Sequence, residues 1–427
     1  MQLKYKSINI KGKLAKQLLR NFVSLSIVQG LEMILPLLTV PYLIRIIGVE
    51  NVGLLAFVSA VIGYFGIFIN YGFNLTATKE ISQNVDDKEV IESIFNAVFT
   101  AKNYLILLSA IMLILLILMI PAVEKNAHVY LLSFGTIVLL NISPTWYFQG
   151  IQKLKFITIS NIISKFFFTI MIFVFVREEN DFWIVPAITF IGAFVTSVLS
   201  LIYVVRVHKI RIKKTSFISV LKQYDSGKFV FLSQVKITFF SNINVLILGL
   251  ILGNTAVGLF SSADKVIKVM SALQVPIVSA LFPYFSKLFR EDYKVAFNYI
   301  KKIAVLGTVV YIVIIIVIFI LSNFISSFLF GKALPEIAVL IRIMCTIPLF
   351  VFLNNLYGTQ TLLNLNRDKT FLYNIIGAAA INSFLIYPLG KFFGVYGVSF
   401  SLLITEFYLF VSMYISSVKV KKKLLYD

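Results

Sequence analysis

The chain has 427 residues, of which 59% are hydrophobic and 14% are charged, and its formal net charge is +20. A soluble globular domain averages about 25% charged residues, so this composition excludes an ordinary soluble protein and indicates a multi-pass membrane protein. The positive charge does not indicate nucleic-acid binding, because the basic residues lie at the ends of apolar segments, where topology signals occur.

Apolar segments long enough to cross a bilayer recur along the whole chain. A helical crossing needs about 20 mainly apolar residues. By that rule the first half contains six predicted membrane helices, at 22–47, 52–72, 98–120, 129–149, 157–177 and 183–205. The second half contains six more, at 229–252, 259–283, 303–322, 336–357, 371–390 and 396–418. The sequence therefore predicts an all-α polytopic membrane protein of about twelve helices.

The distribution of basic residues predicts the orientation of these helices. If the N-terminus is inside, most lysines and arginines fall in inner segments, and Lys102, near the start of the third helix, is counted with them. The outer loops carry only Lys125, Arg177, Lys332 and Lys391. Because cytoplasmic segments are enriched in lysine and arginine, both termini are predicted to lie in the cytoplasm.

The two halves of the chain repeat a pattern of residues at a constant offset of 205 positions. In this pattern Gly48, Val52, Gly53 and Leu54 match Gly253, Val257, Gly258 and Leu259. Each half has six predicted helices, so both copies have the same orientation and form a parallel repeat about an axis along the membrane normal. We therefore expect two six-helix bundles, at 1–205 and 229–427, joined by a basic cytoplasmic linker at 206–228.

The predicted helix 259–283 contains three charges in an apolar setting: Asp264, Lys265 and Lys268. One charge at the centre of a membrane helix costs about 2.5–3.5 kcal/mol on insertion scales. Asp264 and Lys268 share one helix face, which is predicted to face other helices or a water-filled cavity rather than lipid tails. The matching positions of the first half hold Ser59, Ala60 and Gly63. We interpret this asymmetry as functional, because a purely structural role would favour charges in both copies.

Five further charged residues fall inside predicted spans, namely Glu32, Arg45, Lys236, Arg342 and Glu406. All eight charges together comprise five cations and three carboxylates, so a cavity that they line has a positive potential and attracts a phosphate-bearing ligand. Two structural alternatives stay open. Arg45 and Lys236 lie close enough to helix ends to snorkel to the interface. Buried ion pairs, such as Asp264 with Lys268, would fix helix register.

Enzyme motifs are absent from the sequence. There is no phosphate loop, zinc-ligand spacing or nucleophile elbow, so we expect no catalysis, no metal and no cofactor. The two histidines, His128 and His208, fall in predicted loops, which argues against a histidine proton relay inside the bilayer.

Several stretches carry a family resemblance through their order and spacing. They are PLLTVPYLIR (36–45), YGFNLTATKE (71–80), PTWYFQG (144–150), ADKVIK (263–268), FPY (282–284), NLNRDK (364–369) and GVYG (394–397). Together they resemble the polysaccharide-export branch of the multidrug/oligosaccharidyl-lipid/polysaccharide superfamily, in particular Wzx-type O-antigen flippases. The resemblance covers about residues 15–418.

The resemblance implies two six-helix bundles around a central cleft and a substrate consisting of an oligosaccharide linked to undecaprenyl diphosphate. A flippase of this kind moves its substrate from the inner to the outer leaflet of the bacterial inner membrane by alternating access. We then expect Lys265, Lys268, Arg342, Arg45 and Lys236 to contact the substrate headgroup. Asp264, Glu32 and Glu406 are candidates for ion coupling. The lipid bilayer and other surface-polysaccharide assembly proteins are the further partners expected.

Two alternative functions stay open at this point. A multidrug exporter of the same superfamily would favour a pocket rich in carboxylates and aromatic residues, and the excess of cations here argues against it. A membrane-embedded polysaccharide polymerase would need a catalytic constellation, often in a large outer loop. The longest predicted outer loop has only about a dozen residues.

Overall fold

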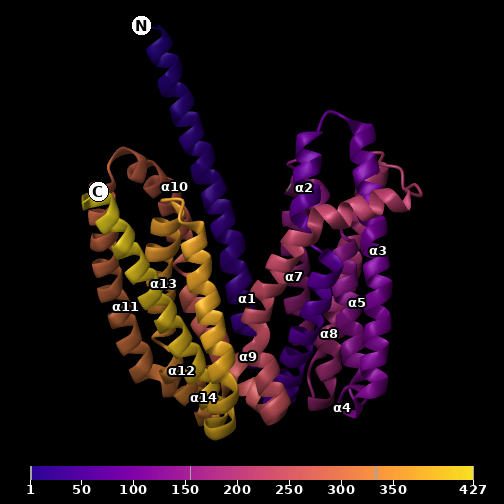
Figure 1. The fold of residues 1–427 in the computed structure, drawn as a ribbon. Helices are drawn as coiled ribbons and strands as arrows, with labels where there is room; N and C mark the ends of the chain where they lie inside the picture. The colour runs from indigo at the N-terminus through magenta and orange to yellow at the C-terminus, as the bar shows by residue number, and fades with distance from the viewer. Residues whose placement is uncertain (1, 154, 332–333, 427) are drawn as a thin grey trace. The chain divides into compact units, whose positions relative to one another are not determined.

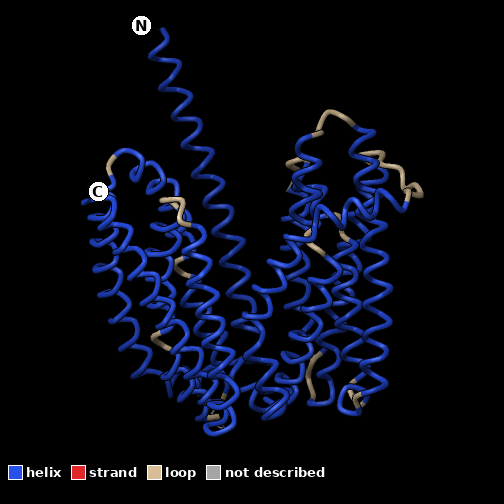
Figure 2. Tube along the Cα trace, in the orientation of Figure 1, coloured by secondary structure: helices blue, strands red, loops and turns tan. Residues whose placement is uncertain are grey.

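The computed structural model describes residues 2–153, 155–331 and 334–426, and nearly all of these residues are helical (Figure 1). Side chains are described within these ranges except at 2–34, 155–158, 161, 236–241, 280, 425 and 426. No strand occurs in the described ranges, as the tube in Figure 2 also shows. The all-α class predicted from the sequence is therefore confirmed.

The helices follow one another with short connections. The first half of the chain contains α1 (Gln2–Asn70), α2 (Phe73–Gln83), α3 (Lys88–Met119), α4 (Pro121–Glu124), α5 (Ala127–Ile142), α6 (Thr145–Gly150), α7 (Lys155–Phe175), η1 (Glu179–Trp183) and α8 (Ile184–Arg206). The second half contains α9 (Phe217–Ala272), α10 (Val275–Glu291), α11 (Tyr293–Phe330), α12 (Pro335–Met344), α13 (Ile347–Asn354), the π-helix η2 (Asn355–Leu363) and α14 (Asp368–Tyr426).

The predicted number of membrane helices agrees with these elements. Eight helical runs among the described residues are long and apolar enough to span a membrane. Three of them contain two predicted spans each, because the helix continues through a glycine kink, at Gly48 in α1, Gly253 in α9 and Gly394 in α14. The shorter apolar helix Ile162–Phe175 corresponds to the fifth predicted span. With each half of a kinked helix counted separately, these segments account for twelve helices.

Contacts divide the chain into two compact units, which we call the N-proximal unit (Tyr42–Gly258) and the C-proximal unit (Met1–Pro41 with Leu259–Asp427). The segment after α8 is a loop only as far as residue 216, and α9 then runs through the end of the predicted linker. The bundle boundaries predicted at 205 and 229 stay a prediction.

The repeat is visible in the N-proximal unit, where two equivalent glycines each lie close to a backbone carbonyl group. A Cβ atom at Gly53 would lie 1.8 Å from the carbonyl oxygen of Asn254, and one at Gly258 would lie 2.0 Å from that of Val49. Positions 254 and 258 equal positions 49 and 53 plus the repeat offset, so the two contacts are equivalent, as around a twofold axis. We call this pair the reciprocal glycine contact. Its existence supports the parallel repeat predicted from the sequence.

An aromatic core joins two of the stretches that carry the resemblance. Phe73 on α2, Phe95 on α3, and Trp146 and Phe148 on α6 are almost completely buried in one cluster of the N-proximal unit. The rings of Phe95 and Trp146 lie 5.5 Å apart between centroids. Large aromatic side chains contribute much of the apolar area that such a core removes from solvent. The segments 71–80 and 144–150 are thus held together by packing.

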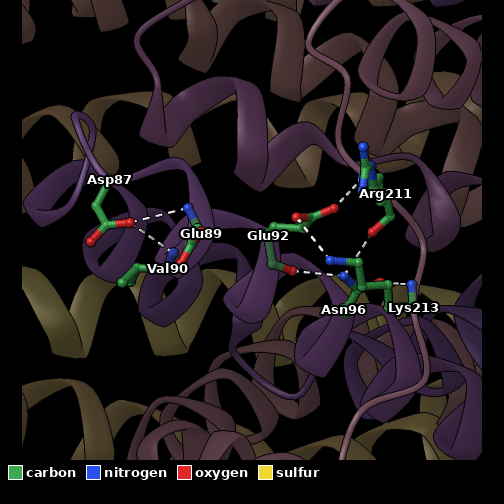
Figure 3. A network of polar contacts seen from close by, with 7 residues as sticks. All are labelled: Asp87, Glu89, Val90, Glu92, Asn96, Arg211 and Lys213. Carbon is green, nitrogen blue, oxygen red and sulfur yellow. Dashed lines mark hydrogen bonds and ion pairs between the residues drawn. The ribbon is translucent and has the colours of Figure 1, made fainter.

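The loop that follows α8 is fastened to α3 by side chains that bind its backbone (Figure 3). The Asn96 amide donates from Nδ2 to the carbonyl oxygen of Arg211 at 2.9 Å, and its Oδ1 accepts from the N–H of Lys213 at 2.8 Å. Glu92, one turn earlier, accepts from the N–H of Arg211 at 2.6 Å. Asn96 is buried, so these bonds satisfy polar groups that would be costly to leave unpaired. The start of the predicted linker is therefore a fixed part of the N-proximal unit.

The C-proximal unit has its own apolar core. Phe285 of α10, Phe297 of α11, Phe352 of α13 and Leu356 of η2 are buried in one cluster. Their apolar side chains pack against one another, as in a helical bundle.

The reciprocal glycine contact gives a stability prediction. Gly53→Ala and Gly258→Ala each place a methyl group against a backbone carbonyl that cannot move independently. We expect each substitution to destabilise the protein by about 1–3 kcal/mol or more, as overpacking does. The melting temperature of the purified protein in detergent measures this effect. Gly192→Ala is the matched control, because a Cβ there meets no atom within 4 Å. Equal melting temperatures for all three variants would contradict the close crossing.

Candidate functional site

The charged part of α9 in the C-proximal unit contains the first group of predicted site residues. Asp264 and Lys268 form an ion pair, with 2.6 Å between Oδ2 and Nζ. The aspartate side chain is only 14% exposed, whereas the lysine side chain is 68% exposed. Lys265 is exposed as well, and its ammonium forms no ion pair or hydrogen bond in the described part of the chain. The ion pair expected from the four-residue spacing therefore forms, and the side chains of Lys265 and Lys268 are both exposed.

Arg342 is held by two contacts with the neighbouring helix α11. Its Nε donates to the hydroxyl of Ser322 at 2.6 Å, and its guanidinium carbon lies 5.7 Å from the ring centroid of Phe319. Both contacts orient the planar group without a carboxylate partner. Within the described residues the other guanidinium N–H groups have no partner, so they are available to an anion that accepts two parallel bonds.

Glu406 lies half-buried on α14 and bonds to the end of α13. Its Oε2 accepts from Nδ2 of Asn354 at 2.8 Å. The side-chain oxygens of Asn354 and of the adjacent Asn355 are buried and have no hydrogen-bond partner in the described part of the chain. Asn355 begins the π-helix η2, and π-helical turns occur frequently at functional sites. This oxygen-rich region suits a proton or a small cation. Among the described residues, no group of three histidine, cysteine, aspartate or glutamate side chains has the arrangement of a metal site.

The other three predicted site residues are less informative. Arg45 has an exposed side chain on α1 in the N-proximal unit. Glu32 and Lys236 fall outside the residues whose side chains the structure describes. The roles assigned to all three stay predictions.

Within the C-proximal unit, some of the predicted site residues lie on the same helical segment, whereas others lie on different helices. Asp264, Lys265 and Lys268 lie on one short helical segment. Arg342 is anchored to α11 and Glu406 to α13, and neither contacts the charged segment through a polar bond between described residues. The C-proximal unit thus contains three separate polar positions.

Lys102 is a buried charge that the sequence analysis missed. Its side chain is only 3% exposed on α3, and Nζ donates to the carbonyl oxygen of Asn141 at 3.0 Å. No carboxylate pairs with it in the described part of the chain. We counted it as an inner topology signal, although its position inside the predicted span 98–120 could have identified it. An unpaired buried ammonium is costly, so this lysine is a candidate functional residue of the N-proximal unit.

Comparison with known proteins gives both sequence and fold relatives. A family model described as polysaccharide biosynthesis protein matches residues 18–289. A protein of Escherichia coli (strain K12) named "Putative O-antigen transporter" is 33% identical over 392 residues, which are 91% of this chain and 93% of that protein.

Two solved structures share the fold. One is an inward-facing multidrug resistance MATE family transporter of the MOP superfamily, with a TM-score of 0.67 and 11% identity, covering 91% of this chain and 96% of that chain. The other is the lipid II flippase MurJ in an inward closed conformation, with a TM-score of 0.67 and 15% identity, covering 92% of this chain and 86% of that chain. These likenesses concern the fold, and they agree with the predicted two-bundle architecture.

Lys102 gives a prediction that separates stability from function. Lys102→Met removes the buried ammonium and nearly keeps the volume of the side chain. Replacing buried charges by apolar groups of similar size is often neutral or stabilising by about 1–4 kcal/mol, so we expect an unchanged or higher melting temperature. Lys79→Met, at an exposed position, is the control and should change little. A large decrease for Lys102→Met alone would mean that the bond to Asn141 is kept for stability.

Proposed function

Because this chain belongs to the polysaccharide biosynthesis protein family, we propose that it is a flippase for an undecaprenyl-diphosphate-linked oligosaccharide, an O-antigen or related surface-glycan unit. It moves this substrate from the inner to the outer leaflet of the bacterial inner membrane, with both termini in the cytoplasm. The observation that carries the proposal is the pair of uncovered ammonium groups on α9, at Lys265 and Lys268. A membrane helix keeps such charges only where water or an anion meets them.

The diphosphate of the substrate is the anion that these lysines suit. Lys268 is held by Asp264, which orients its ammonium and offsets part of its charge. An arriving diphosphate competes with this carboxylate for Lys268 and finds Lys265 unpaired beside it. Arg342 supplies a planar donor pair, because its Nε is already bonded to Ser322. Arg45 and Lys236 are the further headgroup contacts, and Lys102 joins them as a candidate in the N-proximal unit.

Transport against a gradient needs a second, coupled ion, and Glu406 is the carboxylate best suited to it. Its one hydrogen bond, from Asn354, leaves the other oxygen without a donor among the described residues. Protonation or sodium binding at this oxygen would neutralise a charge that the half-buried position disfavours. Asp264 and Glu32 are the other candidates for ion coupling. Alternating access then proceeds by movement of the two repeated bundles, as in other transporters built from repeats.

The multidrug-exporter alternative has less support. The MATE transporter and the flippase MurJ have equal TM-scores against this chain, so the fold does not separate the two functions. The 33% identity with the O-antigen transporter relative and the excess of cations over carboxylates favour an anionic glycolipid. Other surface-polysaccharide assembly proteins are the proposed partners of this step.

The headgroup contacts are tested by complementation. In a strain that lacks this protein, we expect Lys265→Ala, Lys268→Ala and Arg342→Ala each to lower surface glycan by about tenfold or more, since a bond to a charged group contributes about 1.5–3 kcal/mol. The lipid-linked intermediate should accumulate. Lys301→Ala, an exposed lysine of the same unit, is the matched control. Full surface glycan with all three variants would exclude this site, and drug resistance without any effect on glycan would favour the exporter.

The coupling role of Glu406 is tested by Glu406→Gln. The amide oxygen of glutamine can still accept from Asn354, so we expect the fold and the melting temperature to be kept. Flipping by the protein in vesicles should lose its dependence on an imposed proton or sodium gradient. Glu291→Gln, which changes an exposed carboxylate, is the control. A Glu406→Gln variant that responds to both gradients like the wild type would exclude Glu406 from coupling.

A further inference from the structure

A pocket of about 300 Å³ lies in the N-proximal unit, and its lining contains none of the residues proposed to bind the glycolipid. It is formed by the α2–α3 connection, the start of α3, the turn after α6 and the loop after α8. Its polar lining consists of Asp86, Lys88, Tyr147, Lys153 and His208. Its apolar lining consists of Val85, Ile91, Ile151 and Ile210, of which Ile91 and Ile210 are buried. The pocket therefore combines an apolar floor with a polar, mainly cationic rim.

His208 provides an unused donor in the wall of this pocket. Its Nδ1 lies 2.9 Å from the hydroxyl of Tyr147, which forms no other hydrogen bond with the described residues. A phenol is a better donor than acceptor, so Tyr147 donates to Nδ1 and the proton of the neutral ring lies on Nε2. Burial and the nearby charge of Lys153 lower the pKa of His208, which keeps the ring neutral. Nε2 is buried and has no partner among the described residues.

The charges at the rim favour one anionic group. Lys88 and Lys153 both line the pocket, are exposed and come from different segments of the chain. Among the described residues that line the pocket, Asp86 is the only carboxylate. The adjacent Asp87 caps α3 by accepting from the N–H groups of Glu89 and Val90. Two ammonium groups and a histidine N–H against one carboxylate suit a phosphate group.

Two residues with left-handed backbone angles hold these side chains in place. Gln152, next to Lys153, has φ 57°, and Lys209, next to His208, has φ 54°. Such angles are uncommon for residues other than glycine. Backbone hydrogen bonds fix both turns, from the N–H of Lys153 to Phe148 at 2.9 Å and from that of Ile210 to Val204 at 3.3 Å. The pocket is thus preformed.

We propose that this pocket binds the phosphate ester of a ligand, with Lys88 and Lys153 on its oxygens and His208 as the third donor. Exposed apolar side chains lie along the neighbouring loop and the start of α9, at Val207, Ile212 and Phe217. A basic pocket beside exposed apolar residues matches the boundary between headgroups and acyl chains. An anionic phospholipid is therefore the first source of the phosphate, and a soluble phosphate is the second. The proposal does not depend on the proposed transport function.

The test measures the melting temperature of the full-length protein in detergent during titration with dioleoylphosphatidylglycerol, dioleoylphosphatidylcholine or inorganic phosphate. We expect phosphatidylglycerol to raise the melting temperature saturably and phosphatidylcholine to leave it unchanged. The Lys88→Gln/Lys153→Gln variant should need at least about tenfold more phosphatidylglycerol for half of this increase, given the strength of bonds to charged groups. Lys214→Gln/Lys222→Gln removes two exposed lysines that do not line the pocket and is the matched control.

The source of the phosphate is decided by the third titration. A saturable increase with inorganic phosphate that is lost in Lys88→Gln/Lys153→Gln supports the site with a soluble ligand. Two results would overturn the proposal, namely no increase with either anion, or equal responses from the pocket variant and the control variant. All four lysines are exposed, so the substitutions should leave the fold intact.

Discussion

The close backbone crossing at Gly53 and Gly258 constrains both halves of the repeat at once. Each glycine meets a carbonyl oxygen of the other repeat at a distance where no Cβ fits, so the two helix turns approach only if both residues lack a side chain. Each of these glycines lies in the helical segment that follows a kink, at Gly48 in α1 and at Gly253 in α9. Asp264 and Lys265 follow Gly258 on the same segment of α9.

The two copies of this helix make equivalent backbone contacts, but the side chains at matching positions differ in polarity. Ser59, the counterpart of Asp264, is exposed and donates to the carbonyl oxygen of Leu55 in its own helix, at 2.7 Å. Ala60, the counterpart of Lys265, is buried. The N-proximal unit has a buried charge at another position, Lys102 on α3. Matched geometry with unmatched polarity therefore distinguishes the two copies of this helix.

The sequence was sufficient for those features that depend on local spacing. Apolar segment length predicted twelve helices, and the four-residue spacing predicted the pair of Asp264 with Lys268. The constant offset predicted the parallel repeat, which the reciprocal glycine contact supports. Contacts between segments that are distant in the sequence could not be predicted in this way. Asn354 and Glu406 are 52 residues apart, and nothing in either helix indicates their bond. Lys102 was misjudged because a lysine near the end of an apolar segment resembles a topology signal whether or not it is buried.

The cost of placing a charge in a membrane helix helps to distinguish a structural role from a functional role for the charged residues of α9. A structural ion pair needs one cation for Asp264, and Lys268 already provides it at 2.6 Å. Lys265 then remains as an exposed ammonium on an apolar helix, at a cost of about 2.5–3.5 kcal/mol if it faced lipid. Lys265 is not needed to fix the register of the helix, since Asp264 and Lys268 already form a complete ion pair. Water or an anionic headgroup beside the helix removes that cost, and a permeation path supplies both. The proposed ligand site therefore depends on Lys265 more than on its paired neighbour.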